Sequence, residues 1–247
     1  MPISGNNVYE IHQQFIETFK VIPYVRQENM KKLKELGSDN GQMILPIKTL
    51  QALPKNKTYK LLDVGGGTHI LKDFLPSNIE YASLDVEGNQ DFVHNLDHFP
   101  LIVDDQQYDI INCLETLEHC SYPSDVMSEI LRIAKPDAMF FVSIPNEYNF
   151  YCRLNYLFGR KTSVNEPFMV VKNHHHIQLP RVKDTLNFLY NYIQIEQVDY
   201  RWYSRHGGQN KNFVGGIFRV MDGIINFMAQ IWPSLFARTV VVRGKRR

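Results

Sequence analysis

The sequence has 247 residues, 44% hydrophobic and 21% charged, which suits one α/β domain with insertions. Its formal net charge of +1 gives no overall field that favours nucleic acid, so a nucleic-acid partner is not expected. Three cysteines without a C-x-x-C pair, and no secretory or transmembrane run, favour a cytoplasmic location.

The N-terminal region is predicted to be helical. Val8, Ile11, Phe15 and Phe19 recur at helical spacing, and a charge-rich helix over 24–36 follows. We expect residues 1–50 to cover one end of the core.

Short apolar runs then alternate with helical patterns. They predict strands at 59–64, 79–86, 108–114 and 138–144. Before the last of these, Val126, Met127, Ile130, Leu131 and Ala134 mark a helix, with Ser121 or Ser124 as its cap. This alternation predicts a doubly wound, mostly parallel sheet with a cofactor-binding core over 51–145.

The region after residue 145 is less regular. Val182, Leu186 and Leu189 mark a late helix, and strands are expected at 193–200 and 239–243. Two stretches break the alternation, 146–180 and 203–237, and we interpret them as insertions on the substrate side.

The clearest motif is the glycine turn Asp63-Val-Gly65-Gly66-Gly67-Thr68, which follows a predicted strand. Glycines allow the backbone to approach a ligand closely, and Asp85 ends the next strand, where a carboxylate can bind ribose hydroxyls. No Gly-Lys-Ser/Thr follows, and Ile70 replaces the third glycine of a dinucleotide motif. A nucleoside-type cofactor is therefore expected, and a nicotinamide enzyme is a weaker alternative.

From about 59 to 145 the chain resembles the class I S-adenosylmethionine-dependent methyltransferases, notably the subgroup related to ubiquinone- and menaquinone-pathway enzymes. The resemblance is carried by LLDVGGGT, SLDVEG, FVHNLDHFP, YDIINCLETLEHC and LRIAKPDAMFFVSIPN. It implies a Rossmann-like seven-stranded sheet with an antiparallel last strand, and S-adenosyl-L-methionine as cofactor. The implied cofactor-binding residues are Asp63, Gly65, Gly66, Gly67, Asp85, Val86, Asn95, Leu96, Cys113, Leu114 and Glu115. Asn95 stands where the family often has an aspartate that meets the adenine amino group, and an amide oxygen can still accept that hydrogen bond.

Histidines are the candidate catalytic residues, because methyl transfer to a hydroxyl needs a base with a pKa near neutral. His119 follows a strand at the edge where open α/β sheets bind ligands, although its ring could instead shape the loop. His175 and His176, in a histidine run that the resemblance places before the late helix and facing the acceptor, are the other candidates for a base or substrate ligand. No metal is predicted, because no paired Cys or spaced His would complete a zinc site.

The apolar stretch 213–236 has helical spacing and few charges. Three interpretations stay open: a lid over the substrate, a homodimer contact, and a helix lying on a membrane surface. The predicted function is O-methylation of a small molecule, saccharide or lipid-linked acceptor. Alternatives are an RNA or protein methyltransferase and a non-catalytic cofactor-binding relative.

Overall fold

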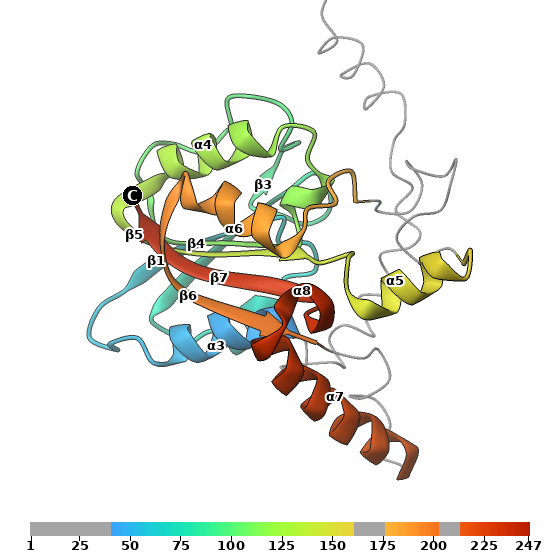
Figure 1. The fold of residues 1–247 in the computed structure, drawn as a ribbon. Helices are drawn as coiled ribbons and strands as arrows, with labels where there is room; N and C mark the ends of the chain where they lie inside the picture. The colour runs from blue at the N-terminus through green and yellow to red at the C-terminus, as the bar shows by residue number, and fades with distance from the viewer. Residues whose placement is uncertain (1–40, 161–175, 203–212) are drawn as a thin grey trace, which may run out of the picture.

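The computed structural model describes residues 41–160, 176–202 and 213–247, which build one seven-stranded sheet (Figure 1). Its strand order is β3-β2-β1-β4-β5-β7-β6. The strands are β1 (Tyr59–Val64), β2 (Ile79–Asp85), β3 (Phe92–Val93), β4 (Tyr108–Leu114), β5 (Ala134–Pro145), β6 (Ile193–Arg201) and β7 (Thr239–Arg246). Strands β1 to β5 are parallel, and β7 runs antiparallel between β5 and β6. The predicted fold class is confirmed, whereas the helices predicted within 1–36 lie outside the described residues.

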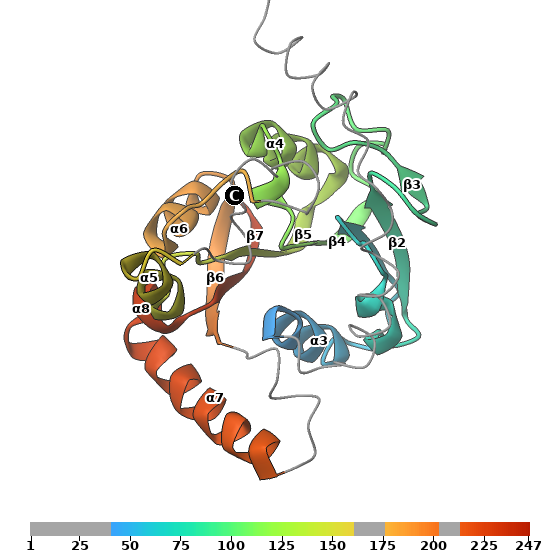
Figure 2. The same ribbon diagram turned by 90° about the vertical axis from the view of Figure 1, so that its right-hand side faces the viewer.

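Helices cover both faces of the sheet (Figure 2). On one face lie α4 (Pro123–Ile133) and α6 (Val182–Tyr190), and on the other lie α3 (Ile44–Gln51), with the 3-10 helix η2 (Gly41–Met43) before it, and the 3-10 helix η3 (Ile70–Phe74). Successive strand residues point to opposite faces, so Leu62 and Ile111 pack in the α4 layer while Leu61 and Ile110 pack in the α3 layer. Burial on both faces explains why these strands are continuous apolar runs.

The predicted boundaries around α4 need correction. Tyr122 occupies the cap position without a side-chain hydrogen bond, and the helix begins with Pro123, whose fixed φ and missing N–H suit a first helical turn. Ser121 is not the cap, because its hydroxyl donates to Asp97, and Ser124 lies inside the helix. At the other end Ala134 belongs to β5, where it pairs with Tyr108 across a register shift.

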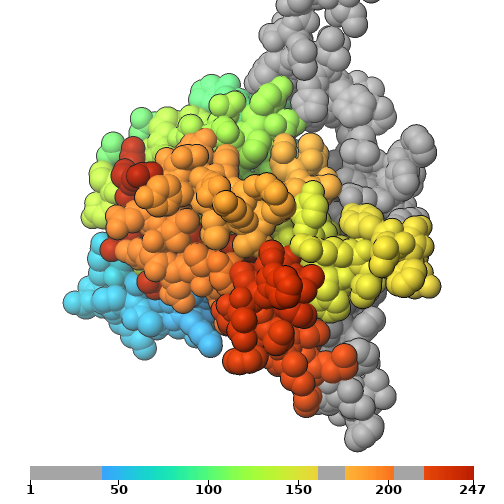
Figure 3. All heavy atoms as spheres, in the orientation of Figure 1, coloured from blue at the N-terminus to red at the C-terminus, as the bar shows by residue number. Residues whose placement is uncertain are grey.

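Three of the helices that follow β5 gather at the carboxyl edge of the sheet. They are α5 (Phe150–Leu157), α7 (Phe213–Ile231) and α8 (Pro233–Phe236). The Phe150 ring stacks 5.0 Å from Trp202 and lies 5.7 Å from Phe236, which joins α5 to α8. Helix α7 extends away from the body of the protein (Figure 1, Figure 3).

Over its described side chains, helix α7 presents large apolar residues to the outside, while its face toward the protein mixes the polar Asp222 and Asn226 with Ile225 and the buried Ala229. Asp222 accepts from the Trp202 indole, Asn226 bonds the Trp202 backbone, and Gln230 donates to the Tyr200 carbonyl. The exposed large apolar residues of the helix are Val220, Met221, Ile224, Phe227 and Ile231. A surface helix normally buries its large apolar residues, so this outward apolar face is a feature that function must explain. Among the described residues, no helix combines the length and apolarity needed to cross a membrane.

Candidate active site

The glycine loop lies at the switch point of the sheet, where β1 and β4 are neighbours. Gly65 and Gly67 have φ angles of 72° and 49°, which glycine adopts without strain. A Cβ on Gly65 would lie 2.2 Å from the Thr116 hydroxyl oxygen, so the loop has no room for a side chain there. The turn therefore brings bare backbone to the carboxyl ends of the strands, where α/β proteins bind ligands.

Asp85 fixes this loop from the end of β2. One carboxylate oxygen accepts from the Gly67 N–H at 2.9 Å and the other from the Val86 N–H at 2.6 Å. The predicted loop and acid are thus brought together, with the Val86 side chain exposed beside them. The close-packed turn and a carboxylate at its edge fit a nucleoside-type cofactor.

Asp63 is buried beneath the loop. It accepts hydrogen bonds from the Tyr81 hydroxyl at 2.8 Å and the Asn112 amide at 2.6 Å. Burial raises the pKa of Asp63 to about 6, because these two bonds offset only part of the desolvation of its charge. Its place below the turn gives Asp63 a supporting position under the glycines.

The segment after β3 is tied to the loop after β4. Asn95 accepts from the Asp97 N–H, and buried Leu96 packs into the core. Asp97, also buried, accepts from the backbone N–H of Ser121 at 2.8 Å and from the Ser121 hydroxyl at 2.9 Å. The two loops that flank the predicted adenine region are therefore joined through one carboxylate.

The end of β4 contributes packing and a strained turn. Cys113 is fully buried, and burial raises the pKa of its thiol, which fits a packing role. The half-buried Leu114 precedes Glu115, which has a φ of 50° and accepts hydrogen bonds from the hydroxyls of Ser143 and Thr239. Glu115 therefore stabilises the turn from the β5 and β7 side.

His119 and His176 come together next to this turn. Their ring centroids are 4.9 Å apart, because the Glu118 carbonyl accepts from the Ile177 and Gln178 N–H groups and pins this segment to the 3-10 helix η4 (Leu117–His119). The His119 side chain is 34% exposed and the His176 side chain 14% exposed. His175, the third predicted catalytic residue, lies outside the described residues.

Two glutamates complete this cluster, and the sequence analysis assigned a role to neither. A Glu118 carboxylate oxygen lies 3.8 Å from Nε2 of His119 and of His176, and a Glu147 oxygen lies 3.2 Å from Nδ1 of His176. Burial, with the charge of Glu115 second, raises the pKa of Glu118 well above its usual range. The segment that packs beside Glu118 lies 58 residues further along the chain, where Gln178 donates to the Cys120 carbonyl, so no local sequence pattern predicts this contact.

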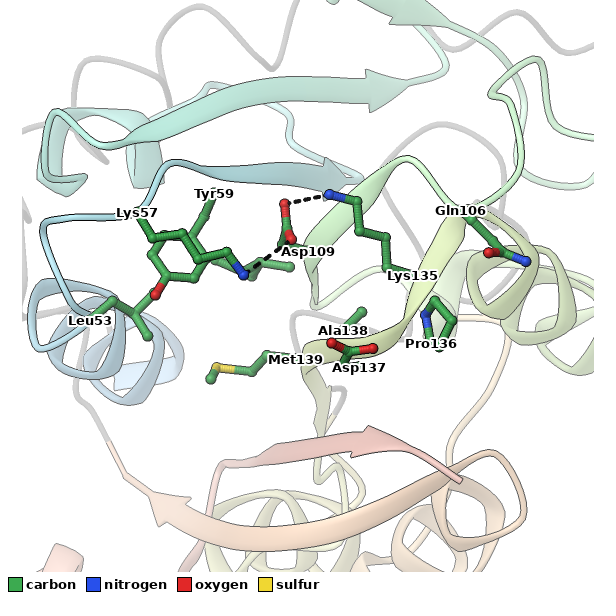
Figure 4. Close-up of a pocket in the computed structure, with 11 residues that line it drawn as sticks. Leu53, Lys57, Tyr59, Gln106, Asp109, Lys135, Pro136, Asp137, Ala138 and Met139 are labelled. Atoms are coloured by element: carbon green, nitrogen blue, oxygen red, sulfur yellow. Dashed lines mark hydrogen bonds and ion pairs between the residues drawn. The ribbon is translucent and has the colours of Figure 1, made fainter.

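A separate cavity of about 370 Å³ opens at the opposite edge of the sheet (Figure 4). It lies where β1, β4 and β5 begin, and Asp109 crosses it with ion pairs to Lys57 and Lys135. The amino ends of parallel strands are not where α/β sheets bind substrates. We therefore place the candidate active site at the carboxyl edge of the sheet, where His119 and His176 lie.

Sequence comparison identifies the family. A family model described as a methyltransferase domain matches residues 24–191. The chain belongs to this methyltransferase family. No curated protein matches the sequence.

Solved structures confirm the fold. The chain is similar to an S-adenosylmethionine-dependent methyltransferase from Thermotoga maritima described as a possible histamine N-methyltransferase, with 12% identity, coverage of 91% of this chain and 97% of that one, and a TM-score of 0.55. A putative methyltransferase from Bacillus halodurans has 12% identity, coverage of 83% and 99%, and a TM-score of 0.53. An S-adenosylmethionine-dependent methyltransferase from Mesorhizobium loti has 14% identity, coverage of 85% and 100%, and a TM-score of 0.50. The expected methyltransferase class is confirmed and S-adenosylmethionine as cofactor is supported, while the ubiquinone-pathway subgroup is not singled out.

Proposed function

We propose that the protein transfers a methyl group from S-adenosylmethionine to a hydroxyl oxygen of a small-molecule, saccharide or lipid-linked acceptor. The observation that carries the proposal is the His119–His176 pair beside buried Glu118, placed at the same edge of the sheet as the glycine loop. An imidazole backed by a carboxylate is suited to accept a proton at neutral pH.

Some residues would bind the cofactor, and others would accept the proton of the acceptor hydroxyl. Gly65, Gly67 and Asp85 would hold the cofactor, which when bound supplies a methyl group already activated on a sulfonium. The acceptor oxygen forms the new bond to the methyl carbon while the carbon–sulfur bond breaks toward sulfur. His119, the more exposed of the paired histidines, or His176 accepts the hydroxyl proton. The protein thus contributes position and a base.

Among the three proposed kinds of acceptor, the outward apolar face of α7 favours a lipid-linked one. Val220, Ile224, Phe227 and Ile231 are each at least 59% exposed, while Asp222, Asn226 and Gln230 of the same helix form hydrogen bonds with Trp202 and Tyr200. We propose that this face lies on a lipid surface that presents the acceptor. Helix α7 leads through α8 to Thr239, which bonds Glu115 at the edge of the active site.

Methyl transfer is tested in two steps. The first is calorimetric titration with S-adenosylmethionine and S-adenosylhomocysteine, with Asp85→Ala as the binding-deficient variant and NAD as a ligand control. The second follows transfer of a radiolabelled methyl group to lipid, saccharide, RNA and protein fractions of a cell extract. Label in an alkali-stable ether of the first two fractions supports the proposal. Label only in RNA or protein, or cofactor binding with no labelled product, contradicts it.

The lipid contact is tested by flotation with anionic vesicles. We expect Ile224→Ser/Phe227→Ser to lose vesicle binding, whereas Val93→Ser/Ile102→Ser, which removes two equally exposed apolar groups on another part of the surface, should retain it. A concentration-independent dimer in light scattering that is lost in the first variant would assign the face to a second copy instead.

A further inference from the structure

Glu118 is a buried carboxylate without a hydrogen-bond donor. Both of its oxygens are inaccessible to solvent, and neither has a hydrogen-bond partner in the described part of the chain. Leaving such a group unpaired is costly, and buried charges are normally paired or coordinate a metal. The other buried carboxylates around the edge differ in this respect, since Asp85 and Asp97 each accept at least two hydrogen bonds.

The groups that face Glu118 are two imidazole nitrogens. Nε2 of His119 and Nε2 of His176 each lie 3.8 Å from the same Glu118 oxygen, and the three ligand atoms lie within 4.8 Å of one another. Ligand atoms bound to one ion at about 2.1 Å lie about 3.4 Å apart at a tetrahedral angle. Each Glu118–imidazole separation would shorten by about 0.4 Å, and the separation of the two imidazole nitrogens by at most about 1.4 Å, to place all three around one ion.

Glu147 orients His176 for this role. Its carboxylate lies 3.2 Å from Nδ1 of His176, outside hydrogen-bond geometry, and its charge at this distance favours the tautomer with the proton on Nδ1. The lone pair of Nε2 then faces the Glu118 oxygen, so two electron-rich atoms point at the space between them. A carboxylate behind the outer nitrogen of a metal-bound histidine is the usual supporting contact at such sites.

The carboxyl groups around the cluster also favour a cation. Glu115, Glu118 and Glu147 are all buried or nearly so, and the first two interact electrostatically. Glu115 is compensated by the hydroxyls of Ser143 and Thr239, and Glu147 by His176 and the Cys152 thiol. Glu118 is left as the carboxylate whose compensation is missing.

We infer that Glu118, His119 and His176 bind one divalent transition-metal ion. One carboxylate oxygen and two imidazole nitrogens suit Zn²⁺, Co²⁺ or Mn²⁺, whereas Mg²⁺ and Ca²⁺ prefer oxygen ligands alone. Three protein ligands leave at least one coordination position open, as in catalytic sites. This inference departs from the prediction of no metal, because the ligands come from two segments whose approach depends on tertiary contacts.

The catalytic consequence rests on the proposed function, whereas metal binding does not. A hydroxyl oxygen bound at the open position loses its proton to water more easily, because the ion stabilises the alkoxide. The two imidazoles then serve as ligands and no longer as the base. Methyl transfer would depend on the ion and be abolished by chelation.

The test is titration of chelator-treated full-length protein with Co²⁺, followed by visible absorption, with no cofactor or acceptor present. We expect one ion per chain and d–d bands of an ordered site. Glu118→Gln and His176→Ala should each lower the affinity at least 10-fold, while His94→Ala, which removes a histidine bonded to the His98 carbonyl, should not. Circular dichroism verifies that each variant is folded.

The neighbouring histidine run needs its own control, because exposed histidines also bind Co²⁺. A His174→Ala/His175→Ala variant should keep the single ordered ion and its spectrum. The inference is overturned if this variant loses binding while Glu118→Gln retains it, or if folded wild-type protein binds no Co²⁺, Zn²⁺ or Mn²⁺ at millimolar concentration. Since no methyl acceptor is used, a failure of methyl transfer leaves this readout unaffected.

Discussion

Buried carboxylates near the glycine loop differ from Glu118 in their hydrogen bonds. We call the glycine-loop region the cofactor side of the active site and the region around His119 and His176 the proposed acceptor side. On the cofactor side, Asp63, Asp85 and Asp97 each accept at least two hydrogen bonds from backbone or side-chain donors. On the acceptor side, buried Glu118 accepts none from the described residues. The buried aspartates of the cofactor side thus have their donors within the described protein, whereas Glu118 has none there and is, in our proposal, paired with a metal ion.

The largest effect is expected where the cofactor side is packed most tightly. Gly65→Ala should destabilise the protein by about 3 to 4 kcal/mol, from positive-φ strain and overpacking, because its Cβ would meet the Thr116 side chain at φ 72°. Urea unfolding measures the change. Gly223→Ala on exposed α7, where a Cβ meets nothing within 4 Å, is the control and should be neutral or stabilising. Equal changes in the free energy of unfolding for the two substitutions would contradict the prediction that the glycine loop is tightly packed and the surface of α7 is not.

The pH dependence of the free energy of unfolding measures how far the Tyr81 and Asn112 hydrogen bonds offset the cost of burying Asp63. Burial raises its pKa from 3.8 to about 6, so between these values the unfolded chain ionises before the folded protein does. The contribution of this carboxyl to stability therefore falls as pH rises from about 4 to 6 and is constant above, a change of about 3 kcal/mol for a shift of about two units. Unfolding of the wild type and Asp63→Asn at pH 4, 5, 6 and 7 should show the difference between them narrowing or reversing in that range. A difference that does not vary with pH would mean that the Tyr81 and Asn112 hydrogen bonds compensate burial fully.

Matched amide substitutions compare the two sides directly. Asp97→Asn should cost about 2 kcal/mol, because charge-assisted bonds to the Ser121 backbone and hydroxyl weaken. Chemical denaturation measures it, with exposed Asp137→Asn as the control. No loss in Asp97→Asn would show that these donors are not needed to hold the loops together.

The smallest effect, of opposite sign, is expected on the acceptor side. In chelator-treated protein, Glu118→Gln should raise the free energy of unfolding by about 1 kcal/mol, because the wild-type carboxyl must either bury its charge without a donor or take up a proton on folding. The same unfolding series measures it. Destabilisation comparable to that of Asp97→Asn would mean that Glu118 is compensated within the protein.

The sequence predicts the parts of this molecule that depend on local pattern. Strands such as 59–64 and 108–114 are buried on both faces, so their apolar runs are visible in the sequence, and the glycine turn with Asp85 has a recognisable spacing. The predicted cap of α4 was wrong, because two partners compete for the Ser121 hydroxyl. It donates to Asp97 and does not cap the helix.

The acceptor side could not be predicted in the same way. Glu118 is an ionisable residue in a short 3-10 turn, and residues 176–178, far along the chain, return onto its carbonyl, so the sequence gives no local sign of its burial. The apolar spacing of α7 predicts a helix, but its orientation is fixed by polar contacts of Asp222, Asn226 and Gln230 with the end of β6. Amphipathic spacing alone does not say which face turns inward.

The place of β7 has a consequence for biosynthesis. This strand is inserted between β5 and β6, and β6 pairs with no other strand in the described sheet. In a nascent chain on the ribosome, β6 and the edge of β5 that pairs with β7 therefore have no strand partner until residues 239–246 have left the exit tunnel. Such edges invite aggregation, so chaperone engagement should be greatest between emergence of β6 and completion of β7.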